Sequence, residues 1–90
     1  MYRIELTRTA RKEVLLLEKS EPHTFRKVEK LLLELETHPY KGTGRPKPLS
    51  GDRFGQWSRR ITEKHRLVYQ VEENKIIVLI ISAFGHYDDK

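Results

Sequence analysis

The sequence predicts a single α+β domain of order β-α-α-β-β-β, with two amino-terminal helices packed on a small curved antiparallel sheet. Apolar residues recur at helical spacing only before residue 36, whereas alternating and β-branched runs follow residue 55. A segment rich in proline and glycine separates the two halves. A chain of 90 residues is too short for two stable cores, so residues 1–90 are expected to form one domain.

The amino-terminal half begins with an alternating run, "YRIEL", which predicts a strand at Tyr2–Leu6. A first helix is expected from about Ala10 to Lys19, with Thr7 or Thr9 as its N-cap. Ser20 is then expected to cap a second helix, since Pro22 is tolerated in a first turn. The apolar stripe of this second helix consists of Phe25, Val28, Leu31, Leu32 and Leu35.

The segment 37–52, "THPYKGTGRPKPLSGD", cannot form a helix or a central strand. It holds three prolines and three glycines in sixteen residues. We therefore expect a loop that leads into the sheet.

Three strand-like runs follow the loop. The run 56–61 alternates, with Trp57, Arg59 and Ile61 on one side and Ser58 and Arg60 on the other. In the run 65–71, the residues that share one face are His65, Leu67, Tyr69 and Val71, and those opposite are Arg66, Val68 and Gln70. A hairpin turn at 72–74 leads to "KIIVLIISAF", whose apolar residues on both faces predict an interior strand covered on both sides.

The net charge of +5 is concentrated in one central segment. Eight of the 18 basic residues but two of the 13 acidic residues lie between Lys41 and Arg66, so this segment carries +6 and the remainder carries −1. Such a patch fits a polyanion such as RNA, which attracts Lys and Arg through long-range electrostatics. A solubilising surface explains the same charge, and composition alone does not separate the two.

Other features exclude several classes of protein. The chain has no cysteine, hence no disulfide framework and no thiol chemistry. No apolar run resembles a signal sequence or a membrane span, so a soluble cytoplasmic protein is expected. The four histidines lack metal-ligand spacing, there is no acidic cluster, and "GTGRP" is not a P-loop, so neither a metal nor another cofactor is expected.

The chain ends in "GHYDDK", with His86 and Tyr87 directly after the most apolar run. RNA cleavage by the 2′-hydroxyl needs a base, a cation on the phosphoryl oxygens and an acid for the leaving 5′-oxygen. Histidine suits the proton transfers, arginine the phosphate, and tyrosine can orient a phosphate or stack on a base. The alternative is that His86 is a solvated histidine near the chain end with no catalytic role.

Several motifs occur together in the carboxyl-terminal half: "KGTGRPKPL", "WSRRIT", "HRLVY" and a terminal "HY". In order and spacing they resemble the YoeB/Txe family of toxins within the RelE-like superfamily. The amino-terminal half resembles it in pattern more than in residues. The resemblance implies a RelE-like, microbial-ribonuclease-like fold and an mRNA endonuclease that enters the ribosomal A site and inhibits translation.

The resemblance also assigns roles to individual residues. Arg66 in "HRLVY" matches the family's phosphate-stabilising arginine, His86 its general acid, and Tyr87 the terminal tyrosine that positions the substrate. Here the chain continues past the usual end as "DDK".

One position departs from the family pattern. The general-base glutamate of "KPEPL" is replaced by Lys47 in "RPKPL". An ammonium acts as a base only after losing its proton, and lysine is ordinarily charged at neutral pH. Repulsion from Arg45 and Arg66, together with burial, would favour the neutral amine. Lys47 is therefore either a base or a phosphate clamp.

The catalytic candidates are thus Lys47, Arg66, His86 and Tyr87, and the residues expected to contact RNA are Lys41, Arg45, Arg59, Arg60 and Lys64. The resemblance implies a YefM-like antitoxin, the ribosome and mRNA as partners, and operator DNA only through the antitoxin complex. No membrane partner is expected, and a homodimer stays open. The alternatives are a weakened or inactive homologue that still binds the ribosome or the antitoxin, and a free-standing basic nucleic-acid binder.

Overall fold

The computed structural model describes residues 1–85 of the chain. Its helices and strands, in chain order, are β1 (Arg3–Leu6), α1 (Arg8–Ser20), α2 (Pro22–Leu35), β2 (Lys47–Pro48), β3 (Trp57–Arg60), β4 (Arg66–Glu72) and β5 (Ile77–Ser82), with a 3-10 turn at Gly51–Arg53. The α+β fold predicted from the sequence is confirmed. The structure adds β2, a two-residue strand at the edge of the sheet.

The strands form one sheet in the order β1-β5-β4-β3-β2. The neighbours from β2 to β5 are antiparallel, but β1 runs parallel to β5, with Arg3 opposite Ile77. The sheet is therefore mixed rather than wholly antiparallel as predicted. The reason is connectivity: two helices and three strands separate β1 from β5, so no hairpin forces the pair to run in opposite directions.

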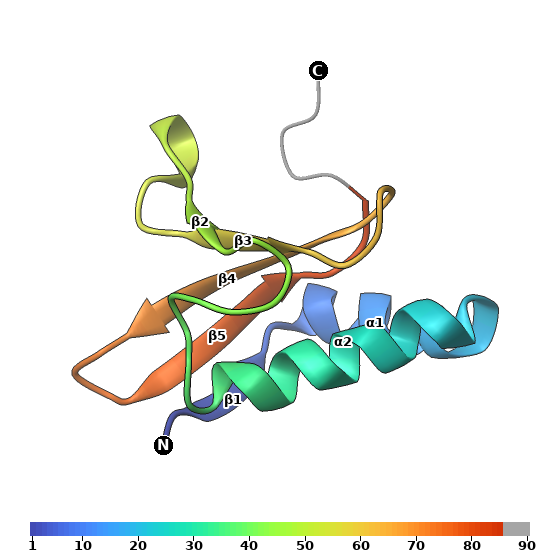
Figure 1. The fold of residues 1–90 in the computed structure, drawn as a ribbon, viewed down its shortest axis with the longest axis horizontal. Coiled ribbons are helices and arrows are strands. Elements are labelled where there is room, and N and C mark those ends of the chain that lie inside the picture. Colours follow the sequence, from blue (N-terminus) through green and yellow to red (C-terminus); the bar gives the residue numbers. More distant parts are fainter. Residues whose placement is uncertain (86–90) are drawn as a thin grey trace.

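Both helices pack on the same face of the sheet (Figure 1). The strand β5 is interior, as predicted, but the predicted cover on both sides is incomplete. Leu79 and Ile81 are only partly buried, because neither helix of residues 1–85 covers the second face.

The core lies between the helices and the sheet. The stripe of α2 buries Val28, Leu31 and Leu35 almost completely, and Leu67 and Tyr69 meet it from β4. The periodicities read from the sequence therefore identify the core-facing sides of both elements.

The helix caps are confirmed in one case and wrong in the other. The Thr7 hydroxyl oxygen accepts the Ala10 N–H at 3.0 Å and so caps α1. Ser20 instead ends α1, where its hydroxyl donates to the Leu16 carbonyl oxygen at 2.8 Å. Glu21 occupies the N-cap position of α2, because α1 continues up to the residue before it.

Candidate functional site

Three cationic residues of the segment 41–66 share one face of the sheet. Lys47 in β2 pairs with Ser58 in β3, and Arg60, two residues further along β3, pairs with Arg66 in β4. Paired residues point to the same side of a sheet, as do alternate residues along a strand. Lys47, Arg60 and Arg66 therefore lie on the face opposite the helices.

Arg66 is half-buried at the start of β4, and part of its guanidinium is already bonded. Nη1 donates to the carbonyl oxygens of Thr62 at 2.7 Å and His65 at 3.2 Å, which orients the group. Within residues 1–85, neither Nε nor Nη2 has a bonded partner. Three N–H donors thus remain for an anion such as a phosphoryl group.

The end of the described chain lies beside Arg66. The backbone N–H of Arg66 donates to the carbonyl oxygen of Gly85 at 2.9 Å. His86 follows Gly85 directly in the sequence, but His86 and Tyr87 themselves lie outside the described residues.

Four of the remaining cationic candidates lie on the surface. Lys41, Arg45, Lys47 and Lys64 are exposed, and the Lys64 ammonium lies 3.6 Å from the Glu21 carboxylate. For Lys47, the burial that would favour a neutral amine is absent. Its side chain is placed at the sheet edge as an accessible cation.

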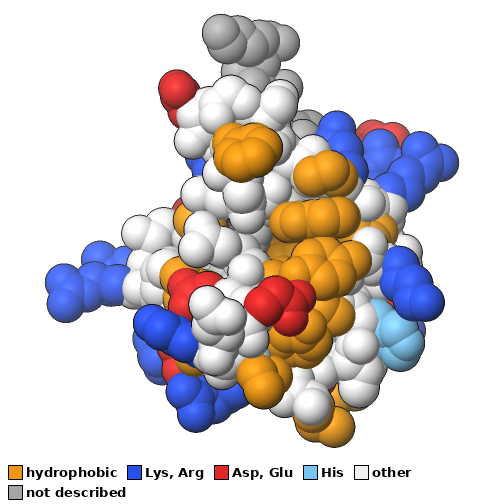
Figure 2. Space-filling model, turned by 90° about the vertical axis from the view of Figure 1, so that its left-hand side faces the viewer, with side chains coloured by type: hydrophobic (Ala, Val, Ile, Leu, Met, Phe, Trp, Pro, Cys, Tyr) orange, Lys and Arg blue, Asp and Glu red, His pale blue; other side chains and the backbone are white. Residues whose placement is uncertain are grey.

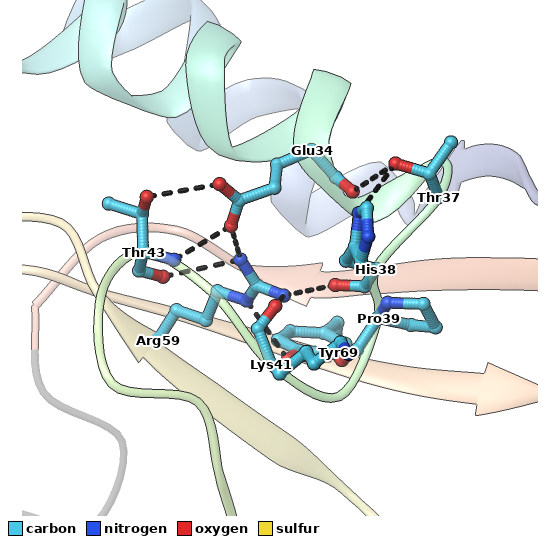
Figure 3. A network of polar contacts seen from close by, with 8 residues as sticks. All are labelled: Glu34, Thr37, His38, Pro39, Lys41, Thr43, Arg59 and Tyr69. Atoms are coloured by element: carbon cyan, nitrogen blue, oxygen red, sulfur yellow. Dashed lines mark hydrogen bonds and ion pairs between the residues drawn. The ribbon is translucent and has the colours of Figure 1, made fainter.

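Arg59 is placed differently from the RNA-contacting role expected of it. The side chain is fully buried, and all five of its N–H donors are used within the protein (Figure 3). Nη1 and Nη2 bind the Glu34 carboxylate and three backbone carbonyls of the loop, at His38, Lys41 and Thr43. Nε donates to the hydroxyl oxygen of Tyr69 at 3.2 Å. Arg59 is therefore an anchor for the loop 38–43 and is removed from the candidate RNA contacts.

A signal for this anchor was present in the strand alternation. It placed Arg59 on the same side as Trp57 and Ile61, which are core residues. Its partner Glu34 lies 25 positions away in α2, where no local pattern marks it.

The loop before Lys47 adopts strained backbone conformations. Gly44 has a φ of 86°, and a Cβ at this position would lie 2.8 Å from the Arg60 carbonyl oxygen. Arg45 has a φ of 52°, which is uncommon for a residue with a side chain. Such conformations often occur in binding and catalytic loops.

A second cluster, missed by sequence reasoning, joins the segment after α2 to the amino terminus, to β3 and to the turn between β4 and β5. The hydroxyls of Tyr2 and Tyr40 both donate to the Glu73 carboxylate, and the rings of Tyr40 and Trp57 lie 5.1 Å apart. The hydrogen bonds lower the pKa of Glu73, that from Tyr40 most. Figure 2 shows hydrophobic side chains gathered in a band on this side of the molecule, with Lys and Arg at its margins.

In the described part of the chain, no three His, Cys, Asp or Glu residues are grouped so as to hold a metal ion. No helix between residues 1 and 85 is both long and apolar enough to cross a membrane.

The chain is similar to known toxins in sequence. Residues 7–87 match the model of the YoeB-like toxin of bacterial type II toxin–antitoxin systems. A Toxin YoeB from Streptomyces coelicolor is 38% identical over 68 residues, which cover 76% of this chain and 79% of that protein.

Solved structures agree. A YoeB/ParE toxin from Agrobacterium tumefaciens superimposes with a TM-score of 0.90 at 30% identity, covering 94% of this chain and 99% of that one. The YoeB dimer and the YoeB–YefM complex, both from Staphylococcus aureus, give TM-scores of 0.84 and 0.83 at 29% and 27% identity. They cover 96% and 97% of this chain, and 98% and 99% of theirs. The chain belongs to the YoeB-like toxins of bacterial type II toxin–antitoxin systems.

Proposed function

We propose that this toxin is a metal-independent endoribonuclease that cleaves mRNA in the ribosomal A site and thereby inhibits translation. The observation that carries the proposal is the hydrogen bond between the Arg66 N–H and the Gly85 carbonyl oxygen. Arg66, the candidate phosphate-binding residue, begins β4, and His86, the candidate for proton transfer, directly follows Gly85 in the sequence. The bond therefore links β4 to the residue just before His86.

The proposed reaction uses the RNA's own 2′-hydroxyl as nucleophile. A base removes its proton, the 2′-oxygen attacks phosphorus, and the bond to the 5′-oxygen breaks, leaving a cyclic phosphate and a 5′-hydroxyl. The free N–H donors of Arg66 stabilise charge on the phosphoryl oxygens. His86 protonates the leaving 5′-oxygen, and Tyr87 orients the substrate.

We assign Lys47 to the phosphate rather than to proton abstraction. Its exposure at the sheet edge keeps the ammonium solvated, and it shares a face with Arg60 and Arg66. Together with Lys41, Arg45 and Lys64, these cations form a candidate surface for the RNA backbone.

Dependence on the ribosome follows from the incomplete set of catalytic groups. Holding a scissile phosphate in line with its nucleophile can supply roughly 7–11 kcal/mol of the barrier. A codon pinned in the A site provides this alignment, whereas free RNA does not.

The test is to map mRNA ends after the purified protein is added to ribosomes stalled on a defined codon. We expect a cut within the A-site codon that is lost in His86→Ala. Lys47→Glu restores the carboxylate of the family pattern and is expected to raise cleavage, whereas a fall would make Lys47 the base. No cut by the native protein or by Lys47→Glu would contradict the nuclease.

A second candidate is a toxin homologue that binds the ribosome or antitoxin without cutting. The exposed ammonium at the base position favours it. A cut by Lys47→Glu alone, with equal ribosome binding by the native protein, would select this candidate.

We further propose a YefM-like antitoxin as the partner, because the similar Staphylococcus aureus toxin was solved as a YoeB–YefM complex. A YoeB from the same organism was also solved as a dimer, so self-association is the second expected assembly. Co-expression with the antitoxin, followed by light scattering on the purified complex and on the toxin alone, tests both. Operator DNA is expected to bind only the complex, and the site of action is the cytoplasm.

A further inference from the structure

His65 is a buried imidazole that none of the proposed catalytic steps uses. It is 2% exposed and precedes Arg66 directly. Its backbone is held on both sides: its carbonyl oxygen accepts the Ile61 N–H at 3.0 Å, and its N–H donates to the Thr62 hydroxyl oxygen at 3.2 Å. The ring therefore stands on a fixed support.

Each ring nitrogen of His65 has one partner. The Gly85 backbone N–H lies 2.8 Å from Nδ1, and the Glu21 carboxylate lies 3.2 Å from Nε2. A backbone N–H only donates, so Nδ1 must be the unprotonated acceptor. The proton is therefore on Nε2, which donates to the Glu21 carboxylate. By accepting this bond, Glu21 favours the tautomer in which Nδ1 is free to accept from the Gly85 N–H.

The short segment after β5 is held by side chains from two other elements. The Ala83 N–H donates to the Glu13 carboxylate of α1 at 2.8 Å, and the Gly85 N–H donates to His65. The Phe84 ring lies 4.5 Å from the imidazole, centre to centre. Each residue of the segment 83–85 thus has a contact that restrains it.

Gly85 is bonded at both ends of its backbone. Its N–H is held by the His65 ring, and its carbonyl oxygen by the N–H of Arg66, the next residue along the chain after His65. Its φ of 74° is one that residues with a side chain rarely adopt. The backbone of Gly85 is therefore held by residues 65 and 66.

We propose that His65 is a positioning residue, whose Nδ1 holds the Gly85 N–H and so fixes the backbone that directly precedes His86 and Tyr87 in the sequence. Glu21 supports it by keeping the proton on Nε2. The inference rests on the proposed nuclease function, in which His86 and Tyr87 act on the substrate. A merely structural histidine would fill the core without needing an acceptor at Nδ1.

Two amide variants separate the ring nitrogens. In His65→Asn, the amide oxygen takes approximately the place of Nδ1, so an acceptor for Gly85 is retained. In His65→Gln, the amide reaches the place of Nε2, so Glu21 keeps a donor and Gly85 loses its acceptor. Both variants lose the ring, so their effects on packing are matched.

We expect His65→Gln to lower kcat for A-site cleavage about 100-fold, the scale of a misplaced catalytic group, with little change in KM for programmed ribosomes. His65→Asn is expected to keep most of the native rate. Equal losses in both variants, or native activity in His65→Gln, would overturn the proposal.

A second measurement does not depend on cleavage. Amide hydrogen exchange of the ¹⁵N-labelled full chain should show Gly85 protected in the native protein and His65→Asn, but not in His65→Gln. Equal exchange in all three would overturn the tether itself. If the native protein fails to cut mRNA, the nuclease proposal fails, while the exchange pattern still decides whether His65 holds the segment.

Discussion

Arg59 and His65 are both buried polar side chains, and each anchors one of the two segments that lead to the candidate site. Arg59 holds the loop 38–43, which precedes Lys47, and uses five N–H donors to do so. His65 holds the segment 83–85, which precedes His86, through one acceptor nitrogen. The Arg59 side chain thus makes several bonds to its loop, whereas the His65 side chain makes one to its segment, which Glu13 and the Arg66 backbone also hold.

The two anchors also differ in their hydrogen-bonding role. The Arg59 guanidinium has donors only, and all five are used within the protein. The His65 ring gives the segment 83–85 one acceptor, Nδ1. We infer that the Arg59 side chain holds the loop 38–43 more firmly than the His65 side chain holds the segment 83–85.

Removing the Arg59 guanidinium is expected to have the largest effect on stability. Arg59→Met leaves Glu34 and three loop carbonyls without their donor, so we expect the free energy of unfolding to fall by about 3–5 kcal/mol. The adjacent, exposed Arg60→Met is the matched control and should change it by less than about 0.5 kcal/mol. Urea unfolding followed by circular dichroism measures both. Similar values for the pair would mean that Arg59 is not the anchor.

Replacing one glycine beside each anchor is expected to have a smaller effect on stability. Gly44→Ala puts a Cβ 2.8 Å from the Arg60 carbonyl oxygen, in addition to a φ of 86°. Gly85→Ala meets a similar backbone strain at 74°, but among the described residues no atom beyond its chain neighbours lies within 4 Å of the added Cβ. We expect Gly44→Ala to cost about 2–3 kcal/mol and Gly85→Ala about 1–2 kcal/mol. Thermal unfolding of both variants checks the order, and the reverse order would contradict a rigid loop.

The Tyr69 hydroxyl is one part of the Arg59 anchor whose contribution to stability can be measured separately. The Tyr69 hydroxyl accepts from Arg59 and donates to the Pro39 carbonyl oxygen at 2.8 Å. Tyr69→Phe leaves that buried carbonyl unbonded and should cost about 1–3 kcal/mol. Tyr2→Phe, whose hydroxyl meets the exposed Glu73 carboxylate, is the control and should cost less. Equal stabilities of the two variants in urea would show that the Pro39 bond contributes nothing.

The smallest expected effect is the acid dependence of stability, which involves one carboxylate at each anchor. Burial raises the pKa of Glu34, but hydrogen bonds from Thr43 and Arg59 outweigh it, so the net pKa lies below the ordinary 4.5. The hydrogen bond from His65 likewise lowers the pKa of Glu21 below 4.5. Below that pH the unfolded chain binds more protons than the folded one, so this stability is lost as the pH falls toward the folded pKa values.

Urea unfolding between neutral pH and pH 3 tests this dependence. Glu34→Gln and Glu21→Gln should each flatten the acid branch of the stability curve, since each removes a carboxylate that folding keeps ionised. An unchanged slope in either variant would indicate that its carboxylate is not held by the anchor. Glu18→Gln, on the exposed surface of α1, is the matched control.

Features encoded by a local pattern could be predicted from the sequence. A feature that depended on neighbouring helices could not. The stripe of α2, the alternation of β4 and the loop around Gly44 are each encoded within a few residues, and the structure confirms them. The prediction for Ser20 was wrong because a serine ending one helix and a serine capping the next look alike when only one residue separates the helices. The parallel pairing of β1 with β5 depends on the path of the whole chain.

The roles of the buried polar residues needed the structure. Alternation placed both Arg59 and His65 on the core side of their strands, yet the charge of Arg59 suggested RNA. Charge indicates what a side chain can bind, but not which partner is closer. That choice depends on contacts with Glu34 and Glu21, which lie 25 and 44 positions away in the sequence.

The residues alone thus specify the elements, the core faces and the membership of a toxin family, because periodicity and motif spacing are properties of short stretches of chain. Folding specifies which cations remain exposed, which tautomer His65 adopts and which groups bond to Gly85. These properties depend on distances between atoms that are remote in sequence. A hydrogen bond forms only within about 3.2 Å, a separation that spacing along the chain does not encode.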